Sequence, residues 1–149
     1  MRLVVQRVDK ASVSVNNQVI ASIGTGLLVF LGIERGDTAG DADLMLEKAI
    51  NLRIFEDREG KMNLSLLDVA GGLLVVSQFT LLGDCWKGKR PSFIRAEDPE
   101  QAKGLYEYFI KRAVEKVARV AGGEFQAMMK VELVNDGPVT MLLDSRRRF

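Results

Sequence analysis

The chain has 149 residues, 47% hydrophobic and 28% charged, which is typical of one folded domain and excludes a disordered chain. It contains no histidine and one cysteine, Cys85, which excludes histidine-dependent triads, imidazole zinc sites, intramolecular disulfides and multi-cysteine metal cages. Because the net charge is only +1, any contact with a nucleic acid must come from local basic segments.

No segment of the sequence is typical of a signal peptide or a membrane span. The N-terminal residues are too charged for a leader. The longest apolar stretches, residues 26–33 and 71–76, are far shorter than the roughly 20 residues that cross a bilayer. A single thiol also fits a reducing compartment. We therefore expect one cytoplasmic domain over residues 1–149, with no membrane partner.

The first part of the chain predicts strands from its valine-rich alternation. Residues 1–9 predict one strand and residues 11–16 a second. The asparagine pair at 16–17 is typical of a turn, so residues 18–23 are expected to return antiparallel as a hairpin. Residues 26–33 are apolar on both faces, which predicts a central buried strand.

The middle of the chain predicts a helix followed by two strands. The apolar residues after position 38 recur at three- and four-residue spacing, which predicts the helix. Asp37 or Thr38 can cap its start. Residues 53–55 predict a short strand. Residues 73–80 predict a second buried strand, which begins apolar and ends polar.

The clearest predicted helix follows a long loop over residues 81–98. Asp98 is its expected N-cap, with Pro99 in the first helical position. Gln101 is expected to complete a capping box. An unbroken apolar stripe extends this helix as far as the glycine pair at 122–123, which is expected to stop it.

The chain is expected to end in two strands, residues 128–134 and 139–143, joined by a turn at 135–138. Because strands and helices do not alternate regularly, we expect an α+β fold. Its large mixed, mostly antiparallel sheet would carry two main helices packed on it. A doubly wound sheet is the alternative, but no glycine-rich phosphate loop follows the first predicted strand.

The second buried strand ends in Ser77, Gln78, Phe79 and Thr80, which we call the SQFT segment. Three of these residues carry hydrogen-bonding side chains. Strand ends often carry functional groups, because the scaffold is rigid there and solvent begins. The alternative is that these side chains satisfy nearby backbone groups as the strand leaves the core.

The motif NDGPVT, residues 135–140, is a second candidate site. Its composition first of all predicts a turn between strands. A Gly-Pro bond can also be cis at modest cost. In that geometry the carbonyls of Gly137 and Pro138 would form a rigid pair of main-chain acceptors.

Residues 86–95 (WKGKRPSFIR) form a basic segment with two aromatic residues and no acidic residue. Its cations are Lys87, Lys89, Arg90 and Arg95. Basic side chains interleaved with aromatic ones suit phosphate contact and base stacking, which makes the segment a candidate RNA contact. The alternative is a solvated loop. Residues 146–148 are a second basic cluster, which we expect to be a solvated tail, with RNA contact as the alternative.

Several motifs together resemble the D-aminoacyl-tRNA deacylase (D-tyrosyl-tRNA deacylase) family. The strongest are SQFTL from Ser77, RPSF from Arg90 and NDGPVT from Asn135, and their order and spacing favour function over the alternatives above. Weaker matches are QRV at 6–8, ASV at 11–13, GLLV at 26–29, RIFEDREGKMNLSL at 53–66 and LYEYF in the long helix. The resemblance covers nearly the whole chain.

The resemblance implies an α+β homodimer in the cytoplasm, with active sites at the subunit interface and no metal or other cofactor. It implies that the chain hydrolyses the ester bond of D-aminoacyl-tRNA, which releases free D-amino acid and tRNA, and that it also acts on mischarged glycyl-tRNA. Such an enzyme proofreads chirality by rejecting L-amino acids. A non-catalytic nucleic-acid-binding dimer is the alternative.

The resemblance also implies roles for single residues. The SQFT segment lines the pocket of one subunit, and Gly137–Pro138 corresponds to a Gly-cisPro pair that reaches into the partner's pocket. Arg7 corresponds to an arginine that supports this pair, and Met129 to a pocket methionine. The sequence departs from the family just before Met129, so no pocket role is carried over to Gln126 or Met128.

The missing histidine limits the chemistry that such a site can use. We expect the backbone N–H groups of Phe79 and Thr80 to stabilise the oxyanion, while the substrate's own ribose hydroxyl helps to position water. The rival hypothesis makes Thr80 a nucleophile, for which the sequence offers no obvious base. We expect the Gly137 and Pro138 carbonyls to occupy the space that an L side chain needs, so that glycine and D-amino acids are accepted.

Overall fold

The computed structural model describes residues 1–149 and has eight strands and two α-helices. Their bounds in chain order are β1 (Arg2–Val15), β2 (Gln18–Ile23), β3 (Gly26–Gly32), α1 (Ala39–Asn51), β4 (Phe55–Glu56), β5 (Met62–Leu64), β6 (Gly72–Ser77), the 3₁₀ helix η1 (Phe79–Leu82), α2 (Pro99–Val114), β7 (Arg119–Gly122) and β8 (Met129–Asp144). The expected α+β class is confirmed. No helix is both long enough and apolar enough to cross a membrane.

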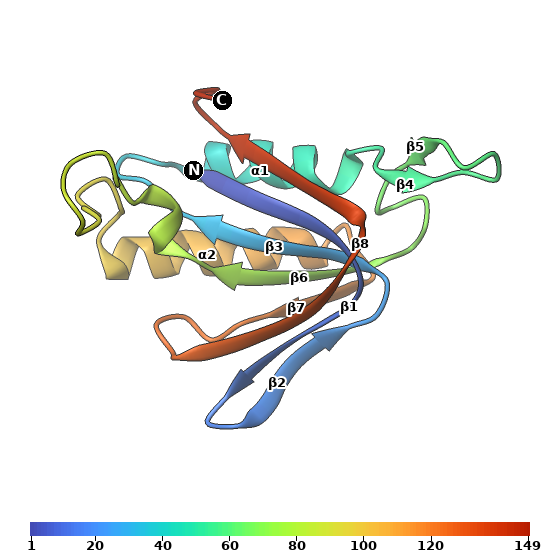
Figure 1. The fold of residues 1–149 in the computed structure, drawn as a ribbon, viewed down its shortest axis with the longest axis horizontal. Helices are drawn as coiled ribbons and strands as arrows, with labels where there is room; N and C mark the ends of the chain where they lie inside the picture. Colours follow the sequence, from blue (N-terminus) through green and yellow to red (C-terminus); the bar gives the residue numbers. More distant parts are fainter.

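Strand β1 organises the main sheet, which has six strands (Figure 1). Along one edge β1 pairs antiparallel with β8 over nearly its whole length. Along the other edge it pairs first with β3 and then with β2, so these two strands follow one another beside β1. Parallel pairing then adds β6 beside β3 and β7 beside β6. Strands β4 and β5 form a separate hairpin.

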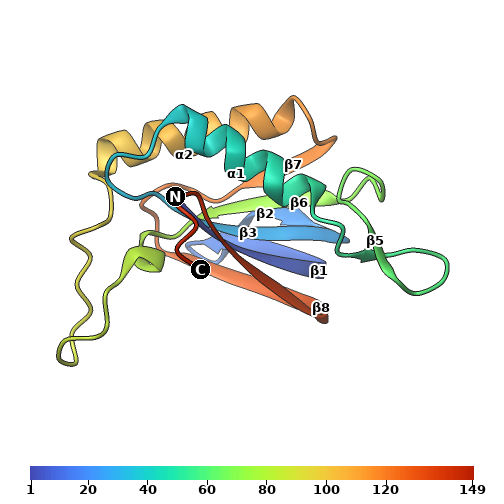
Figure 2. The ribbon, with the colours of Figure 1, turned by 90° about the horizontal axis from the view of Figure 1, so that it is seen from above.

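Both helices cover one face of this sheet (Figure 2). The larger core cluster lies between them and the sheet, and α1 contributes to it Ala42, Met45, Leu46, Ala49 and Ile50. A second cluster, made of Val8, Ala11, Val13, Leu28, Leu74 and Val76, contains residues of β1, β3 and β6. No helix packs on the opposite face of the sheet (Figure 2), which leaves part of that face open.

The two helix starts agree only in part with the predicted caps. Thr38 caps α1 in a complete capping box with Asp41. Helix α2 begins at Pro99 as predicted, but the Asp98 side chain accepts no N–H of the helix. Asp98 Oδ1 accepts instead from Arg35 Nη2 at 3.0 Å, so the predicted capping box with Gln101 is wrong.

Helix α2 ends at Val114, well before the glycine pair that was expected to stop it. The apolar residues after it enter the structure in two other ways. Val117 is buried in the larger core cluster, and Arg119–Gly122 forms β7 beside β6. The edge of β6 has backbone N–H and C=O groups without a partner, and Arg119–Gly122 pairs with them as a strand. The apolar stripe therefore marks burial and not a continuous helix.

Strand β8 runs through the predicted turn, and β1 is one strand where two were expected. Gln6 pairs with Thr140 and Val8 with Asn135, which leaves residues 136–139 opposite Arg7 alone. The turn-like composition therefore produces a bulge inside a continuous strand and not a reversal of the chain. The second buried strand also ends early, at Ser77, because η1 begins at Phe79.

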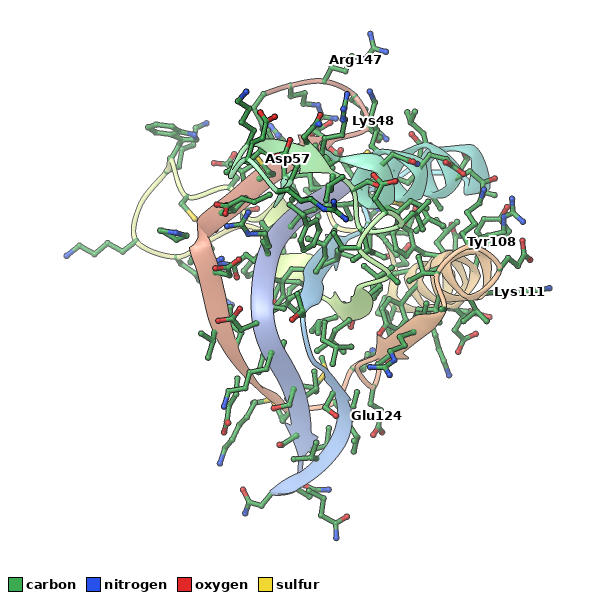
Figure 3. All side chains as sticks on the ribbon, turned by 90° about the vertical axis from the view of Figure 1, so that its right-hand side faces the viewer. Lys48, Asp57, Tyr108, Lys111, Glu124 and Arg147 are labelled. Carbon is green, nitrogen blue, oxygen red and sulfur yellow. The ribbon has the colours of Figure 1, made fainter.

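The basic C-terminal residues are tied to the domain, which corrects the expectation of a solvated tail. Arg148 donates two hydrogen bonds to the buried carboxylate of Glu34, at 2.8 and 2.9 Å. Arg146 donates to the carbonyl of Arg35 at 2.8 Å. Only Arg147 points away from the domain (Figure 3). Two of these three cations are therefore used within the chain.

Candidate active site at the end of β6

The SQFT segment leaves the sheet at the carboxyl end of β6. The Gln78 N–H extends the parallel pairing by donating to Leu31 O at 2.8 Å, and the chain then turns into η1. The first backbone bond of η1 runs from the Leu81 N–H to Gln78 O, so the N–H groups of Phe79 and Thr80 have no acceptor within the helix. Both residues are exposed. Two adjacent main-chain donors are thus available to a ligand oxygen.

The Thr80 hydroxyl has one side-chain partner, the amide of Gln78, which donates to it. No carboxylate or amine contacts this hydroxyl. An alcohol becomes an effective nucleophile only beside a base that removes its proton. The local geometry therefore favours main-chain donors over a nucleophilic Thr80.

The basic segment is attached directly to the SQFT segment. The rings of Phe79 and Phe93 meet edge to face, with centroids 5.0 Å apart. Asp84 and Ser92 close the loop between them through two backbone bonds of 2.8 and 2.9 Å. Residues 85–91, which we call the tip loop, lie beyond this bridge. Aromatic packing and backbone pairing thus hold the tip loop next to the candidate site.

All four candidate RNA contacts are exposed side chains of this segment, and none of them forms an ion pair within the chain. They are Lys87, Lys89, Arg90 and Arg95. Trp86 beside them is 95% exposed. Figure 2 shows the segment between η1 and α2 projecting away from the sheet. The cations are therefore free to meet an anionic partner.

Arg7 is buried beneath the bulge of β8, with 4% of its surface exposed. Its Nη1 donates to the carbonyl of Ile54 at 2.6 Å. Its Nε lies 2.8 Å from Asp136 Oδ2, a close ion pair that lacks the alignment of a hydrogen bond. The guanidinium therefore holds the bulge mainly by charge and packing on this side.

The bulge itself is closed by Asn135, whose role sequence reasoning missed. Its Nδ2 donates to Arg7 O at 2.9 Å and to Val139 O at 3.0 Å. Between these bonds lies the Gly137–Pro138 peptide bond, which is cis, and Gly137 has a φ of +112°. An asparagine two residues before Gly-Pro was the available signal, since such amides often bond to backbone nearby.

Met129 lies near the SQFT segment although it is far from it in sequence. A Cβ atom on Gly123 would lie 2.7 Å from Met129 Sδ and 3.8 Å from Val76 Cγ1. Val76 directly precedes the SQFT segment. Met129 and the end of β6 therefore share one region, whereas Met128 is 92% exposed.

Tyr106 of α2 fixes this region from behind. Its hydroxyl contacts Val75 O at 3.0 Å and Gly123 O at 2.8 Å. Burial raises the pKa of Tyr106 to about 12, so the hydroxyl keeps its proton and donates. Tyr106 belongs to the apolar stripe of the sequence. Its hydroxyl was the only sequence signal of this positioning role, because a buried tyrosine hydroxyl usually finds a hydrogen-bond partner.

Gly137–Pro138 and the SQFT segment do not meet within one chain. Ser77 is level with Leu3 of β1, while the bulge lies opposite Arg7. Four residues along β1 and three strand spacings across the sheet place the two parts about 19 Å apart. Figure 1 shows η1 and the bend of β8 at opposite ends of the sheet.

The fold and site together define a class: a small α+β domain whose candidate site consists mainly of main-chain donors at a strand end, with a basic loop beside it. Within that class the chain belongs to the D-Tyr-tRNA(Tyr) deacylase family, whose model matches residues 4–144.

Relatives match along the whole chain. It is 67% identical over 149 residues to the D-aminoacyl-tRNA deacylase of Syntrophus aciditrophicus (strain SB), with 100% of both chains covered. The corresponding protein of Clostridioides difficile (strain 630) is 56% identical over 149 residues, again with full coverage. These relatives are named for a hydrolase and do not support the alternative of a non-catalytic dimer.

Many solved chains resemble this fold, and two of them carry informative titles. One, titled "c-Myc DNA Unwinding Element Binding Protein", is 42% identical with a TM-score of 0.92, and the match covers 97% of this chain and 98% of that one. The other, titled as a structural analysis of a probable eukaryotic D-amino acid tRNA deacylase, has a TM-score of 0.80 and covers 95% of this chain and 97% of that one. Its identity of 20% supports the fold alone.

Proposed function

We propose that this protein hydrolyses the ester between a D-amino acid and the terminal ribose of tRNA, which releases free D-amino acid and tRNA, and that it treats glycyl-tRNA in the same way. The observation that carries this proposal is the 67% identity, over the full length, to a protein named for that activity. The Phe79 and Thr80 N–H groups, which have no acceptor within η1, agree with it, because ester hydrolysis needs a stabilised oxyanion.

In the proposed reaction, water attacks the ester carbonyl and the developing oxyanion accepts from the Phe79 and Thr80 N–H groups. The substrate's free ribose hydroxyl positions the water. The carbon–oxygen bond to the ribose then breaks, and the ribose oxygen leaves with the proton that the attacking water gives up. Main-chain donors cost no reorganisation at the moment of reaction, because η1 already holds them in place.

We propose that the working enzyme is a homodimer. The separation of Gly137–Pro138 from the SQFT segment supports this, because one chain alone leaves each half of the site incomplete. A twofold copy placed on the open face of the sheet would bring each bulge to its partner's SQFT segment.

The open face of the sheet has a surface that suits such contact. Leu142 is 58% exposed there, and Gln6 Nε2 bonds Thr140 Oγ1 at 3.1 Å beside the bulge. At the other end, Arg2 donates to Leu81 O of η1 at 2.9 Å. An exposed leucine between these polar pairs is typical of an interface core.

Chirality follows from exclusion in this dimer. The carbonyls of Gly137 and Pro138 would fill the space that an L side chain needs, while a D side chain points away. Arg7 supports this pair from below, and Met129 lines the pocket. Such a filter rejects one hand without recognising the accepted side chain, so broad acceptance of D-amino acids is expected.

The remaining parts of the proposal concern location and the tRNA. Lys87, Lys89, Arg90 and Arg95 would contact its phosphates. A cytoplasmic location follows from a substrate of translation. In the decisive experiment, the purified protein is incubated with D- and L-aminoacyl-tRNA that carry the same amino acid, and with glycyl-tRNA. Release of D-amino acid and glycine, but not of L-amino acid, is expected. Binding of tRNA without D-selective release would favour the non-catalytic alternative.

A further inference from the structure

We propose that Trp86 stacks on a nucleobase of the unpaired 3′ end of the aminoacyl-tRNA that precedes the terminal adenosine, and that the tip loop guides this end into the candidate active site. The inference rests on the proposed function, which it makes more specific. It assigns the first contact of the RNA to one aromatic side chain and its neighbouring cations.

The first support is the exposure of Trp86. It is 95% exposed, although tryptophan is among the residues that gain most from burial. Its backbone N–H donates to Asp84 Oδ1 at 3.0 Å, which fixes the start of the tip loop. A large aromatic face held at the surface by an ordered backbone is suited to stacking on a partner.

The second support is charge. Residues 85–95 contain four cations and no carboxylate in a protein whose net charge is +1. The acidic residue before them, Asp84, has its Oδ1 engaged by the Trp86 N–H and its backbone paired with Ser92. The segment therefore presents positive charge beside an exposed ring, the combination that binds single-stranded nucleic acid.

The third support is distance from the site. The Gly83 N–H donates to Thr80 O at 3.0 Å, and Gly83 lies three residues before Trp86. Three residues span at most about 11 Å, so the start of the tip loop lies close to the SQFT segment. An RNA end whose terminal ribose reaches Thr80 therefore lies within reach of this loop. A base in a duplex hides both faces by stacking, whereas an unpaired base leaves a face for Trp86.

Trp86 is the only tryptophan of the protein, so its fluorescence reports on this contact without any hydrolysis. The intact protein is titrated with a short single-stranded RNA that carries the 3′-terminal sequence of tRNA. Saturable quenching that weakens with salt is expected. A blunt duplex of the same sequence is the matched control, and single-stranded DNA tests the need for the 2′-hydroxyl. Unchanged fluorescence with the single strand, or equal quenching by the duplex, would overturn the proposal.

Kinetics provide the second test, with Trp86→Ala, Trp86→Phe and the α2 surface control Lys111→Ala (Figure 3). Two substrates are compared: D-aminoacyl-tRNA and the D-aminoacyl ester of adenosine alone. Trp86→Ala should raise KM for the tRNA substrate about tenfold, the effect of one lost stacking contact, and leave the adenosine ester unchanged. Trp86→Phe keeps an aromatic ring, so its KM for the tRNA substrate should stay close to that of the wild type.

The outcomes separate this inference from the proposed function. Equal losses on both substrates, or none on either, would contradict a stacking role for Trp86. Quenching by the single strand in a protein that releases no D-amino acid would overturn the proposed function while the RNA contact stands.

Discussion

The guanidinium of Arg7 and the α-carbon of Gly137 are in such close contact that a Cβ atom on residue 137 would lie 2.8 Å from Arg7 Nη2. The same atom would lie 2.8 Å from Val139 Cγ2. Asn135 adds a bond to the Arg7 carbonyl, so the bulge is tied to Arg7 through both main chain and side chain. The direction of the Gly137 carbonyl therefore depends on a residue that itself touches no substrate in the proposed site.

Gly137→Ala is expected to reduce discrimination between D- and L-aminoacyl-tRNA by at least tenfold, because the new methyl group displaces the bulge. The variant should also lose more than about 1 kcal/mol of unfolding free energy, since alanine is strained at a φ of +112°. The kcat/KM values for both hands and urea unfolding measure these effects. Gly60→Ala is the control, because Gly60 has a φ of +75° with nothing within 4 Å. It should lose stability and keep selectivity; a selectivity loss in both variants would contradict the role of the bulge.

Arg7→Lys should lower the free energy of unfolding by about 1–3 kcal/mol and reduce D/L discrimination. Lysine keeps the charge near Asp136, but one ammonium cannot also bond Ile54 O and fill the space under Gly137. Thermal unfolding and kcat/KM for both hands are the measurements. Arg53→Lys is the matched control, since Arg53 is an exposed arginine that bonds Asn63 O at 2.8 Å. A wild-type selectivity in Arg7→Lys would show that Arg7 has no positioning role.

Local patterns predicted most elements correctly where burial and hydrogen bonding agreed. The spacing of Ala42, Met45, Leu46, Ala49 and Ile50 gave α1 its buried face. The doubly apolar run at 26–33 became β3, buried between β1 and β6. In both segments, neighbours far away in sequence only reinforced what the local pattern already favoured.

The misjudged segments depended on partners that lie far away in sequence. Residues 117–121 have a helical pattern, but residues 119–121 pair with the free edge of β6 instead. NDGP has the composition of a turn, but β8 pairs with β1 both before and after residues 136–139. Arg148 looks solvated until Glu34 comes near it. The SQFT segment and Gly137–Pro138 were recognised as motifs, but their separation within one chain is a matter of sheet register, which no local pattern encodes.

Thr80→Ala is expected to keep measurable activity on D-aminoacyl-tRNA, because the proposed oxyanion donors are main-chain groups that the substitution leaves in place. The hydroxyl contacts only the Gln78 amide, so its loss should change kcat modestly. Single-turnover deacylation measures the chemical step. Gln78→Ala is the companion variant that removes the same contact from the other side. Complete loss of activity in folded Thr80→Ala alone would favour a nucleophilic Thr80.

Glu34 makes stability depend on pH. Burial by itself raises the pKa of Glu34, but the hydrogen bonds from Arg148 and the charge of Arg146 outweigh it, so the pKa lies below the ordinary 4.5. The folded state then binds this proton less readily than the unfolded chain. The stabilisation is full above pH 4.5 and is lost as the pH falls through the lowered folded pKa.

Glu34→Gln should therefore lower the free energy of unfolding by about 2 kcal/mol at neutral pH, the value of hydrogen bonds to a charged group in a buried site. The difference from the wild type should shrink as the pH falls below 4.5, because protonation of Glu34 then removes the same interaction. Urea unfolding between neutral pH and pH 3 measures both curves. Glu59→Gln is the control, since Glu59 forms an exposed pair with Lys61 and should leave the curve unchanged. A constant difference between wild type and Glu34→Gln across this range would show that the carboxylate charge does not hold the C-terminal arginines.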